Sequence, residues 1–350
     1  MLRISSIKIA LVTEHLSIGG GPEHLFQICK NMPHYDFKIF AKNGINSDKF
    51  KDLKNVEINN GYAKKDIELY EPDIVHFHSM KPFLFLYKLK FFKLITIHGF
   101  HIHKYEFQKG GIPKVIFFLR KKLESFLYKR ADQIITTSDE DEVTLHKLYK
   151  LNSIKIYNGI DYSLIDGLKP KELLRKELGF LPNKTICITI SRFDFQKDYL
   201  SLVKSIEFLN IKYKDFIFYF VGDGDTKFEI ERYVKSRNIE NIIFLGTRRD
   251  IFNLLKASDI FILPSRWEGM SIAVLQSLGA KNKLLLSDTY GNRTVAKYSK
   301  NIELFSLDDY MDLADKIEAM NTKEYFDEEN FFTLDKMIIS LDNVYKKALE

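Results

Sequence analysis

Cysteine is scarce in this sequence, with two among 350 residues, Cys29 and Cys187. Because the two lie in separate apolar segments, we expect reduced, buried thiols and neither a disulfide nor a cysteine-based metal cluster. Long apolar runs are missing as well, and no stretch of 18 apolar residues suggests a membrane-spanning helix. The short apolar run near the N-terminus ends at Glu14 and has no small-residue cleavage site, so we interpret it as a strand and expect a cytoplasmic protein.

Acidic residues are nearly absent from one part of the chain. Residues 80–130 contain twelve Lys or Arg and only two acids, Glu106 and Glu124, so this stretch carries +10 while the whole chain carries +6. Phe and Tyr are interspersed among these bases, a mixture suited to an anionic membrane surface or to nucleic acid. A core helix with a solvated basic face fits the same pattern, so both interpretations stay open, although no nucleic-acid-binding module is recognisable.

Apolar strand-like segments alternate with helical patterns along the whole chain, which favours parallel sheets covered by helices. A length of 350 residues with 45% hydrophobic content suggests two domains. We predict an N-terminal domain over 1–165, a second domain over 166–332 and a C-terminal helix over 333–350 that has room to pack back towards the first domain. The predicted strands are 6–14, 37–42, 73–79, 93–99, 133–138, 154–159, 185–192, 215–224, 241–247, 259–265 and 283–288.

Polar residues and glycines follow several of these strands, where open parallel sheets bind their ligands. The stretch LSIGGGPEHLF follows the first strand, and its glycines would let backbone amides approach a phosphate or a sugar. A dinucleotide fingerprint would need a glycine at the position of His24, so that motif is incomplete. Taken by itself, this stretch is better interpreted as a flexible turn.

Two cations, Arg192 and Lys197, share the loop after the strand TICITISR. Arg with forked hydrogen bonds and Lys as a point charge suit a diphosphate, although surface cations are common. The pair Asp223 and Asp225 resembles a D-x-D metal motif, but we interpret it as a turn followed by an Asp that caps a helix.

Histidines follow two predicted strands, as HFHS at 76–79 and HGFHIH at 98–103. Histidines two apart share a strand face and are able to ligate zinc. No cysteine or matched carboxylate lies near them in the sequence, so we predict a polar acceptor pocket and no metal site.

Glu268 and Gly269 come after the segment DIFILPSRW, at the predicted start of a helix that contains Gln276. If this helix begins at or before Glu268, the two polar side chains lie about two turns apart near one line of its surface. Taken alone, Glu268 is an acid at a helix N-terminus.

In combination these motifs resemble the family 4 glycosyltransferases of the GT-B fold, which have two facing Rossmann-like α/β domains with parallel sheets and a deep cleft between them. The likeness runs through SIKIALVTEHLSIGGGPEH, DIVHFHS, TIHG, ADQIITTS, IYNGID, SRFDFQK, VGDG and ASDIFILPSRWEG, and it depends on their order and spacing. It implies that the donor is a nucleotide-diphosphate sugar and that the N-terminal domain binds the acceptor.

The resemblance assigns roles to individual residues. Arg192 and Lys197 would hold the donor diphosphate, and the backbone amides of Gly20 and Gly21 would reach the donor from the opposite wall. Glu268 would contact the transferred sugar.

The remaining assignments concern the base, the ribose and the acceptor. Amides around Gly269 and Met270 would orient the sugar, Thr247 and Arg248 would lie beside the nucleobase, and His98 would sit near the sugar and the acceptor. Together with His98, the residues Glu268, Arg192 and Lys197 form the predicted catalytic set.

Three positions depart from the family pattern. Gln276 stands where the family has a second Glu, so the ribose would lose a charge-assisted hydrogen bond. Thr294 stands near a position where the family usually has a Glu. Asp198 replaces a glycine that is frequent after the phosphate-binding Lys, which leaves the shape of that loop open.

The resemblance implies transfer of a sugar to a hydroxyl of a glycan or polyprenyl-linked acceptor, with retention at the anomeric carbon and without metal or other cofactor. Since retaining hydrolases use two carboxylates about 5 Å apart and no such pair is evident, the departing phosphate would accept the acceptor proton. Assembly of bacterial surface polysaccharide, on the inner face of the cell membrane, would fit the basic aromatic stretch.

Two other functions stay open from the sequence. A catalytically silent, sugar-nucleotide-binding partner subunit would fit Gln276 and Thr294, although the other predicted site residues are intact. A nicotinamide dehydrogenase would also have two parallel-sheet domains, but the glycine fingerprint for it is incomplete.

Overall fold

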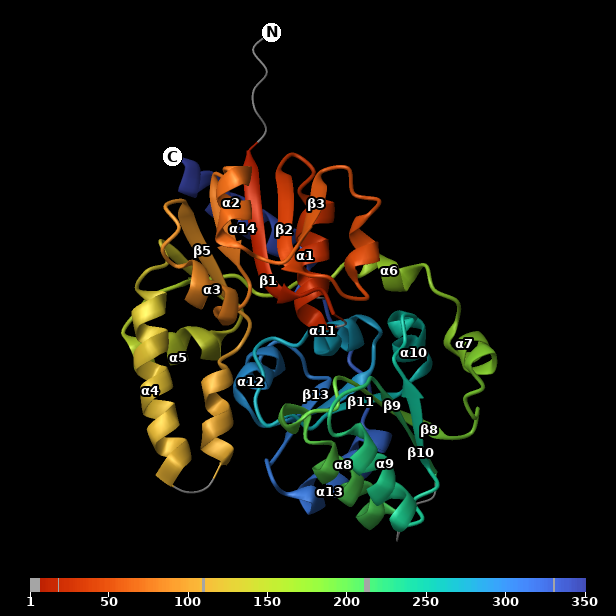
Figure 1. The fold of residues 1–350 in the computed structure, drawn as a ribbon. Coiled ribbons are helices and arrows are strands. Elements are labelled where there is room, and N and C mark those ends of the chain that lie inside the picture. The colour runs from red at the N-terminus through yellow and green to blue at the C-terminus, as the bar shows by residue number, and fades with distance from the viewer. Residues whose placement is uncertain (1–6, 18, 109–110, 211–214, 330) are drawn as a thin grey trace. The chain divides into compact units, whose positions relative to one another are not determined.

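A computed structural model describes residues 7–17, 19–108, 111–210, 215–329 and 331–350. The chain forms two compact units. Unit 1 comprises Met1–Gly159 together with Leu334–Glu350, and unit 2 comprises Ile160–Thr333. Each unit contains one parallel sheet with helices on it, as the alternating pattern predicts (Figure 1).

The sheet of unit 1 has the strand order β3-β2-β1-β4-β5-β6-β7, and all of its neighbouring strands run parallel. Strand β1 lies between β2 and β4, and its Leu11 is in register with both Ile39 and His76. The bounds are β1 (Lys8–His15), β2 (Asp36–Lys42), β3 (Val56–Asn60), β4 (Ile74–Phe77), β5 (Phe92–Ile97), β6 (Gln133–Thr136) and β7 (Ile154–Lys155).

Helices of unit 1 enclose two hydrophobic clusters of its sheet residues. One cluster includes side chains of the first and last helices, and the other includes side chains from the helices between β3 and β7. The helices are α1 (Gly20–Asn31), α2 (Lys64–Tyr70), α3 (Met80–Leu86), α4 (Gly111–Tyr128), α5 (Asp139–Tyr149) and α14 (Leu334–Leu349), with 3-10 turns η1 (Ser47–Phe50) and η2 (His101–Phe107).

The last helix, α14, belongs to unit 1 although it is 174 residues beyond the rest of that unit in sequence. Its Tyr345 is fully buried, and the hydroxyl lies 2.7 Å from Nδ1 of His76 on β4. The hydroxyl of Tyr35 donates to Asp342 of α14 at 2.9 Å. The C-terminus is therefore part of the same core as the first strands, as its blue colour beside the red strands shows in Figure 1.

Unit 2 has a six-stranded parallel sheet in the order β10-β9-β8-β11-β12-β13. Its strands are β8 (Thr185–Ile190), β9 (Phe216–Val221), β10 (Ile242–Gly246), β11 (Ile260–Leu263), β12 (Lys283–Ser287) and β13 (Ile302–Phe305). Its helices are α6 (Ser163–Asp166), α7 (Lys171–Leu178), α8 (Tyr199–Leu209), α9 (Lys227–Ser236), α10 (Ile251–Ala257), α11 (Ile272–Gly279), α12 (Tyr290–Ala296) and α13 (Tyr310–Thr322), with the 3-10 turn η3 (Phe195–Lys197).

The predicted strands are all present, and two further strands, β3 and β13, escape the sequence pattern. Both lie at an edge of their sheet. An edge strand needs fewer apolar residues than a central one, and VEINN of β3 is correspondingly polar. The chain leaves unit 1 after Gly159 and returns at Leu334, and in between Ile160 donates a backbone hydrogen bond to Phe332 at 3.2 Å.

Both cysteines are buried and unpaired, as predicted. Among the described residues, no helix combines the length and the apolar character needed to cross a membrane.

Candidate functional site

A buried ion pair joins two of the predicted site residues of unit 2, Lys197 and Glu268. Lys197 ends η3 after β8, and Glu268 lies in the loop after β11, the neighbouring strand. Nζ of Lys197 donates a hydrogen bond to Oε1 of Glu268. The two side chains are only 13% and 6% exposed, so the pair lies where the attraction between charges is weakly screened.

The loop that carries Glu268 is not helical, which corrects the prediction that a helix starts at this residue. Helix α11 begins at Ile272, with Ser271 in extended conformation as its N-cap. Glu268 and Gln276 therefore do not lie along one face of a helix. Gly269 and Met270 are buried members of the same loop, and Gln276 is half-buried in the middle of α11.

Contacts with the loop after β8 fix the position of this Glu268 loop. Nε2 of Gln196 donates to the carbonyl of Trp267 at 2.8 Å, and the backbone N–H of Arg266 donates to the carbonyl of Gln196 at 2.7 Å. The backbones on either side of the ion pair are thus hydrogen-bonded to each other, which holds the two charged side chains together.

Gly291 packs against the Glu268 loop from the other side, a role that the sequence motifs do not reveal. A Cβ atom on Gly291 would lie 1.3 Å from the carbonyl oxygen of Gly269, and the Gly291 N–H donates to the Glu268 carbonyl at 3.3 Å. Because any side chain at this position would collide with backbone, the start of α12 fixes the loop only when residue 291 is glycine.

Arg192 shares the β8 loop with Lys197 but has a different environment. Its side chain is 61% exposed, and Nη2 lies 3.2 Å from Oδ2 of Asp194. The Asp194 side chain also accepts a hydrogen bond from the Lys197 backbone N–H at 3.1 Å. The structure thus places one predicted diphosphate ligand at the surface and the other in a buried pair.

Asp198 occupies a left-handed backbone conformation, with φ 44° and ψ 46°. Glycine is the usual residue there, and Asp is among the few others that tolerate it. Its buried carboxylate accepts hydrogen bonds from Arg266 at 2.6 Å and from Ser201 at 2.8 Å. Burial raises the pKa of this carboxyl, although Arg266 opposes the shift. The replacement of glycine therefore keeps the loop shape and adds an ion pair.

The loop after β9 approaches the β8 loop closely through two glycines. A Cβ on Gly222 would lie 1.9 Å from the Ser191 carbonyl oxygen, and one on Gly224 would lie 2.3 Å from that of Phe193. Helix α9 begins at Lys227 with Thr226 as its N-cap, so the prediction that Asp225 caps the helix is wrong.

Thr247 and Arg248 follow β10, as the sequence predicts. Arg248 forms a fork with Asp250, with Nε to Oδ1 at 2.8 Å and Nη2 to Oδ2 at 2.5 Å. The pair raises the pKa of the guanidinium and holds the pKa of the Asp250 carboxyl below its usual value. Thr294, where the family pattern suggested an acid, is completely buried in α12.

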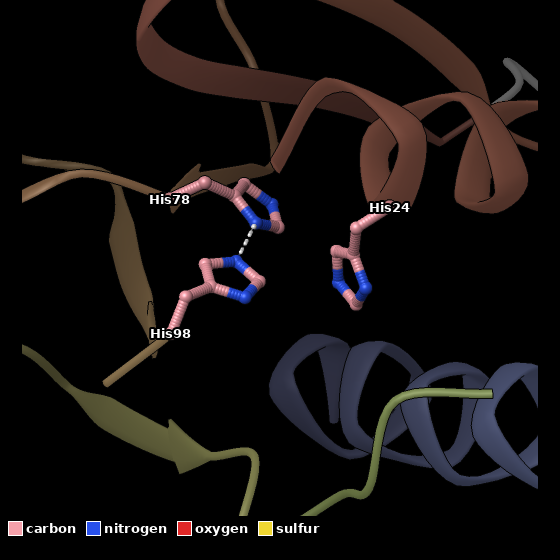
Figure 2. A group of neighbouring side chains, drawn as sticks. All are labelled: His24, His78 and His98. Carbon is pink, nitrogen blue, oxygen red and sulfur yellow. Dashed lines mark hydrogen bonds between the residues drawn. The ribbon is translucent and has the colours of Figure 1, made fainter. Parts of the chain in front are cut away.

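In unit 1, Gly20 and Gly21 are the first two residues of α1, where backbone N–H groups lack partners within the helix. His24 follows within the next turn. The residues after β4 and β5 supply His78 and His98, so three histidines meet at the carboxyl ends of the adjacent strands β1, β4 and β5 (Figure 2).

The histidine group is compact. Nδ1 of His78 lies 3.2 Å from Nε2 of His98, and the ring centroids of His24 and His98 are 4.8 Å apart. Burial lowers the pKa of His98 to about 4 and lowers the pKa values of His24 and His78 well below their usual value. The group is therefore uncharged at neutral pH, in contrast to the ion pair of unit 2.

Helix α4, within the basic aromatic stretch 80–130, is mostly exposed. Its buried side chains lie in the last turns, at Glu124, Leu127 and Tyr128. Its exposed large apolar residues are Ile112, Val115, Ile116, Phe118, Leu119, Leu123 and Phe126. A helix that leaves so many apolar side chains in water does not fit the interpretation as a core helix with a basic face.

Two family models match the chain, one in each half. The model described as "Glycosyltransferase Family 4" matches residues 37–164, and the model described as "Glycosyl transferases group 1" matches residues 170–330. The chain belongs to the family 4 glycosyltransferases. The expected resemblance is therefore confirmed.

Relatives of known name are similar over part of their length. The chain is 31% identical over 251 residues to the UDP-Gal:alpha-D-GlcNAc-diphosphoundecaprenol alpha-1,3-galactosyltransferase of Escherichia coli, covering 68% of this chain and 63% of that protein. It is 27% identical over 191 residues to the N,N'-diacetylbacillosaminyl-diphospho-undecaprenol alpha-1,3-N-acetylgalactosaminyltransferase of Campylobacter jejuni, covering 52% of this chain and 49% of that protein. The match thus spans about half to just under two thirds of these relatives.

Solved structures share the fold at low sequence identity. HepE from Anabaena, in complex with UDP and glucose, has a TM-score of 0.81 with 16% identity, covering 97% of this chain and 100% of that one. The likeness confirms the predicted GT-B class of two parallel-sheet α/β domains.

Proposed function

We propose that this family 4 glycosyltransferase transfers a sugar from a nucleotide-diphosphate sugar to a hydroxyl of a glycan or polyprenyl-linked acceptor, with retention at the anomeric carbon. The observation that carries the proposal is the buried Lys197–Glu268 pair at the carboxyl ends of β8 and β11. These strand ends are where open parallel sheets bind ligands, and they lie within the region matched by the group 1 model.

The charges of unit 2 suggest how the leaving group is stabilised. As the bond between the anomeric carbon and the diphosphate oxygen breaks, negative charge grows on the diphosphate. Lys197 and Arg192 would neutralise it, the ammonium from its buried site and the guanidinium from the exposed side of the same loop. Fixed charges in a site with little water are more effective than the same charges in water.

Glu268 positions the sugar in this mechanism and does not attack it. When the sugar nucleotide binds, the Glu268 carboxylate would accept a hydrogen bond from a sugar hydroxyl. This bond would replace part of the pairing of Glu268 with Lys197. The acceptor oxygen bonds to the anomeric carbon on the face that the diphosphate leaves, and its proton passes to a phosphate oxygen. Because Lys197 and Arg192 take the role that Mg²⁺ has at other diphosphates, this step needs no metal at the diphosphate.

The other donor contacts follow from the strand ends of both units. Thr247 and Arg248 would lie beside the nucleobase, and Gln276 would accept a hydrogen bond from the ribose. Gly269 and Met270 contribute backbone amides near the sugar. Within unit 1, the N–H groups of Gly20 and Gly21 at the start of α1 suit a phosphate, and His98 suits a sugar or acceptor hydroxyl.

A lipid-linked acceptor is favoured by the names of the relatives and by the surface of unit 1. The Escherichia coli and Campylobacter jejuni relatives are named for diphosphoundecaprenol substrates. Helix α4 presents exposed apolar side chains with Lys114, Lys121 and Lys122 among them. We place the protein peripherally on the inner, anionic face of a bacterial cell membrane, in assembly of surface polysaccharide.

The test of the function uses the full chain, a panel of UDP-sugars and a polyprenyl-diphosphate-linked sugar as acceptor, without added Mg²⁺ or Mn²⁺. The expected result is one product whose anomeric configuration, read by NMR, equals that of the donor. An inverted product would contradict retention. Donor binding without transfer or hydrolysis would instead support the silent partner subunit, which Gln276 and Thr294 favour.

The membrane proposal has its own test, because it concerns a different surface. Co-sedimentation with phosphatidylglycerol vesicles at low salt should fall by about tenfold or more when Phe118 and Leu119 are both replaced by Ser. Leu69→Ser is the matched control, since Leu69 is 86% exposed on α2. Equal binding by wild type and the double variant would refute insertion by α4.

A further inference from the structure

Three histidines of unit 1 converge from separate elements. His24 lies on α1, His78 follows β4 and His98 follows β5. One ring nitrogen of each lies within 4.8 Å of the other two, and Figure 2 shows the rings facing a common space. Since each ring is attached to a different strand or helix of the core, the fold holds the three side chains near one another without a local sequence motif.

Two buried nitrogens of this group lack partners. Within the part of the chain that the structure describes, neither Nδ1 of His24 nor Nε2 of His78 has a hydrogen-bond partner. The two residues are only 6% and 7% exposed. Leaving a buried polar atom unpaired is costly, so such atoms in a native protein call for an explanation such as an ion or a ligand.

The spacing within the group is close to that of a metal site. Nδ1 of His78 and Nε2 of His98 are 3.2 Å apart. Zinc–nitrogen bonds of about 2.0–2.1 Å in tetrahedral geometry place two ligand nitrogens about 3.3 Å apart. The His78–His98 pair, which is hydrogen-bonded, thus has the length of one edge of such a site, and one ring nitrogen of His24 lies within 4.8 Å of a nitrogen of each of the other two rings.

The surroundings of the rings favour metal binding as well. The ring of His76 lies behind His78 at 4.0 Å between centroids, and it is fixed by Tyr345 and Thr96, each at 2.7 Å. His78 is therefore backed by a fixed ring.

We propose that His24, His78 and His98 bind one divalent transition-metal ion of the zinc class, with a fourth position for an oxygen ligand. Imidazole ligands without a carboxylate select ions such as Zn²⁺, Co²⁺ or Ni²⁺ over Mg²⁺ and Ca²⁺. The sequence suggests a metal only through histidines two residues apart, and these pairs have no cysteine or carboxylate near them, so no metal site is predicted from the sequence. The structure instead takes one histidine from HFHS, one from HGFHIH and one from α1.

This metal site shares only His98 with the proposed transfer, because the diphosphate ligands Lys197 and Arg192 belong to unit 2 and the three histidines to unit 1. Lys197→Ala should therefore leave metal binding unchanged. A chain that binds the ion but transfers no sugar would overturn the proposed function alone. A chain that transfers sugar but binds no ion would overturn the metal site alone.

The experiment titrates Zn²⁺ and Co²⁺ into the tag-free full chain and measures stoichiometry and affinity. One ion per chain is expected, with the visible absorption of four-coordinate Co²⁺. His24→Ala, His78→Ala and His98→Ala should each weaken binding by at least about tenfold. The matched controls are His34→Ala and His146→Ala, which remove exposed histidines and should change nothing.

Binding that persists in the three alanine variants, or that is lost in the controls, would overturn the proposal. If an alanine variant fails to fold, X-ray absorption of the Zn²⁺-loaded wild-type chain decides the matter. The expected spectrum shows three imidazole ligands on the zinc ion. A zinc ion coordinated by oxygen atoms only would refute the site.

Discussion

At the carboxyl ends of its strands, unit 2 buries the charged pair Lys197–Glu268, whereas unit 1 buries an uncharged histidine group. Arg248–Asp250 is a further ion pair at this edge of unit 2, and Glu14–Lys81 is a more exposed pair at the equivalent edge of unit 1. The start of α1 also lies at that edge of unit 1. Under the proposed function, a polyanionic donor requires fixed positive charge and an acceptor hydroxyl or a metal ion requires neutral lone pairs, so the two similar sheets would have separate chemistry.

Asp141 of unit 1 and Asp259 of unit 2 are neutralised in different ways. Asp141 on α5 is 2% exposed and accepts hydrogen bonds from Ser138 at 2.7 Å and Thr137 at 3.5 Å. Burial raises its pKa to about 7 despite these hydroxyls. Burial would raise the pKa of the half-buried Asp259, but hydrogen bonds from Lys171 and from the Ile186 N–H and the charges of two cations lower it. Neutral donors are not the rule in unit 1, because its buried Glu124 is paired with Arg120.

The largest expected effect comes from breaking the ion pair of unit 2. Lys197→Ala leaves Glu268 buried without its cation, which costs about 3–5 kcal/mol of stability. It also removes the positive charge that would stabilise the leaving diphosphate, so kcat should fall by about 10²–10³-fold. The double variant Lys197→Ala/Glu268→Gln has no unpaired charge. It should recover most of the unfolding free energy but none of the turnover, and recovery of both would show that the pair is only structural.

The opposite pH dependence of Asp141 in unit 1 and Asp259 in unit 2 is the next largest effect. The folded pKa of Asp141 lies above its unfolded value, so its contribution to stability is present at low pH and is lost as pH rises from about 4 to about 7. The loss is on the order of 4 kcal/mol. Asp259 has a lowered pKa, so its contribution is lost as pH falls below about 4. Hydrogen exchange, measured separately for the amides of each unit as a function of pH, checks the direction of both changes in stability.

Asp141→Asn is the variant for this prediction. It should stabilise unit 1 at pH 7, and its advantage over the wild type should grow as pH rises from about 4 to about 7, while unit 2 is unchanged. The buried histidines of unit 1 contribute equally to both proteins, so the comparison isolates Asp141. An advantage that does not grow over this pH range would contradict the raised pKa.

Gly291→Ala tests whether backbone packing holds the Glu268 loop. The new Cβ would meet the Gly269 carbonyl oxygen, so the loop must shift. A loss of about 1–3 kcal/mol is expected from such overpacking, with a fall in kcat on the order of 10²-fold because Glu268 is displaced. Gly167→Ala is the matched control in unit 2, since a Cβ added at Gly167 would have no atom within 4 Å. Equal kinetics for the two variants would exclude a positioning role for Gly291.

The smallest effect is expected from Gln276→Glu, which adds a charge on α11. A charge-assisted hydrogen bond to the ribose is stronger by about 1 kcal/mol than a neutral one. The KM for the donor should therefore fall by about fivefold while kcat stays the same. An unchanged or higher KM would place the ribose elsewhere.

The alternation of apolar segments was sufficient to predict the fold, because central strands of parallel sheets are continuous apolar runs such as those of β1 and β8. The edge strands β3 and β13 were missed, β3 because its exposed positions carry polar residues and β13 because its four residues form a very short apolar run. The start of α11 was also misplaced, since the apolar pattern from Met270 onwards does not distinguish buried loop residues from the first turn of a helix.

For the candidate site, the sequence motifs identified residues that follow strands. They did not identify which of these residues contact one another. The pairing of Lys197 with Glu268, and the group of His24 with His78 and His98, depend on which strands are neighbours. Gly291 could be recognised as a loop support only from the backbone atoms that surround it. Local pattern specifies elements, whereas a site depends on contacts between residues that are distant in sequence.

The central claim is that the Lys197–Glu268 pair of unit 2 belongs to the binding site of a nucleotide-diphosphate sugar. Isothermal titration of UDP-sugars into the full chain tests it most directly, with the Lys197→Ala/Glu268→Gln double variant alongside. The account predicts that the wild-type chain binds a UDP-sugar and that the double variant binds it at least about a hundredfold more weakly, equivalent to about 2.7 kcal/mol. Equal affinity of the two folded proteins would contradict the account.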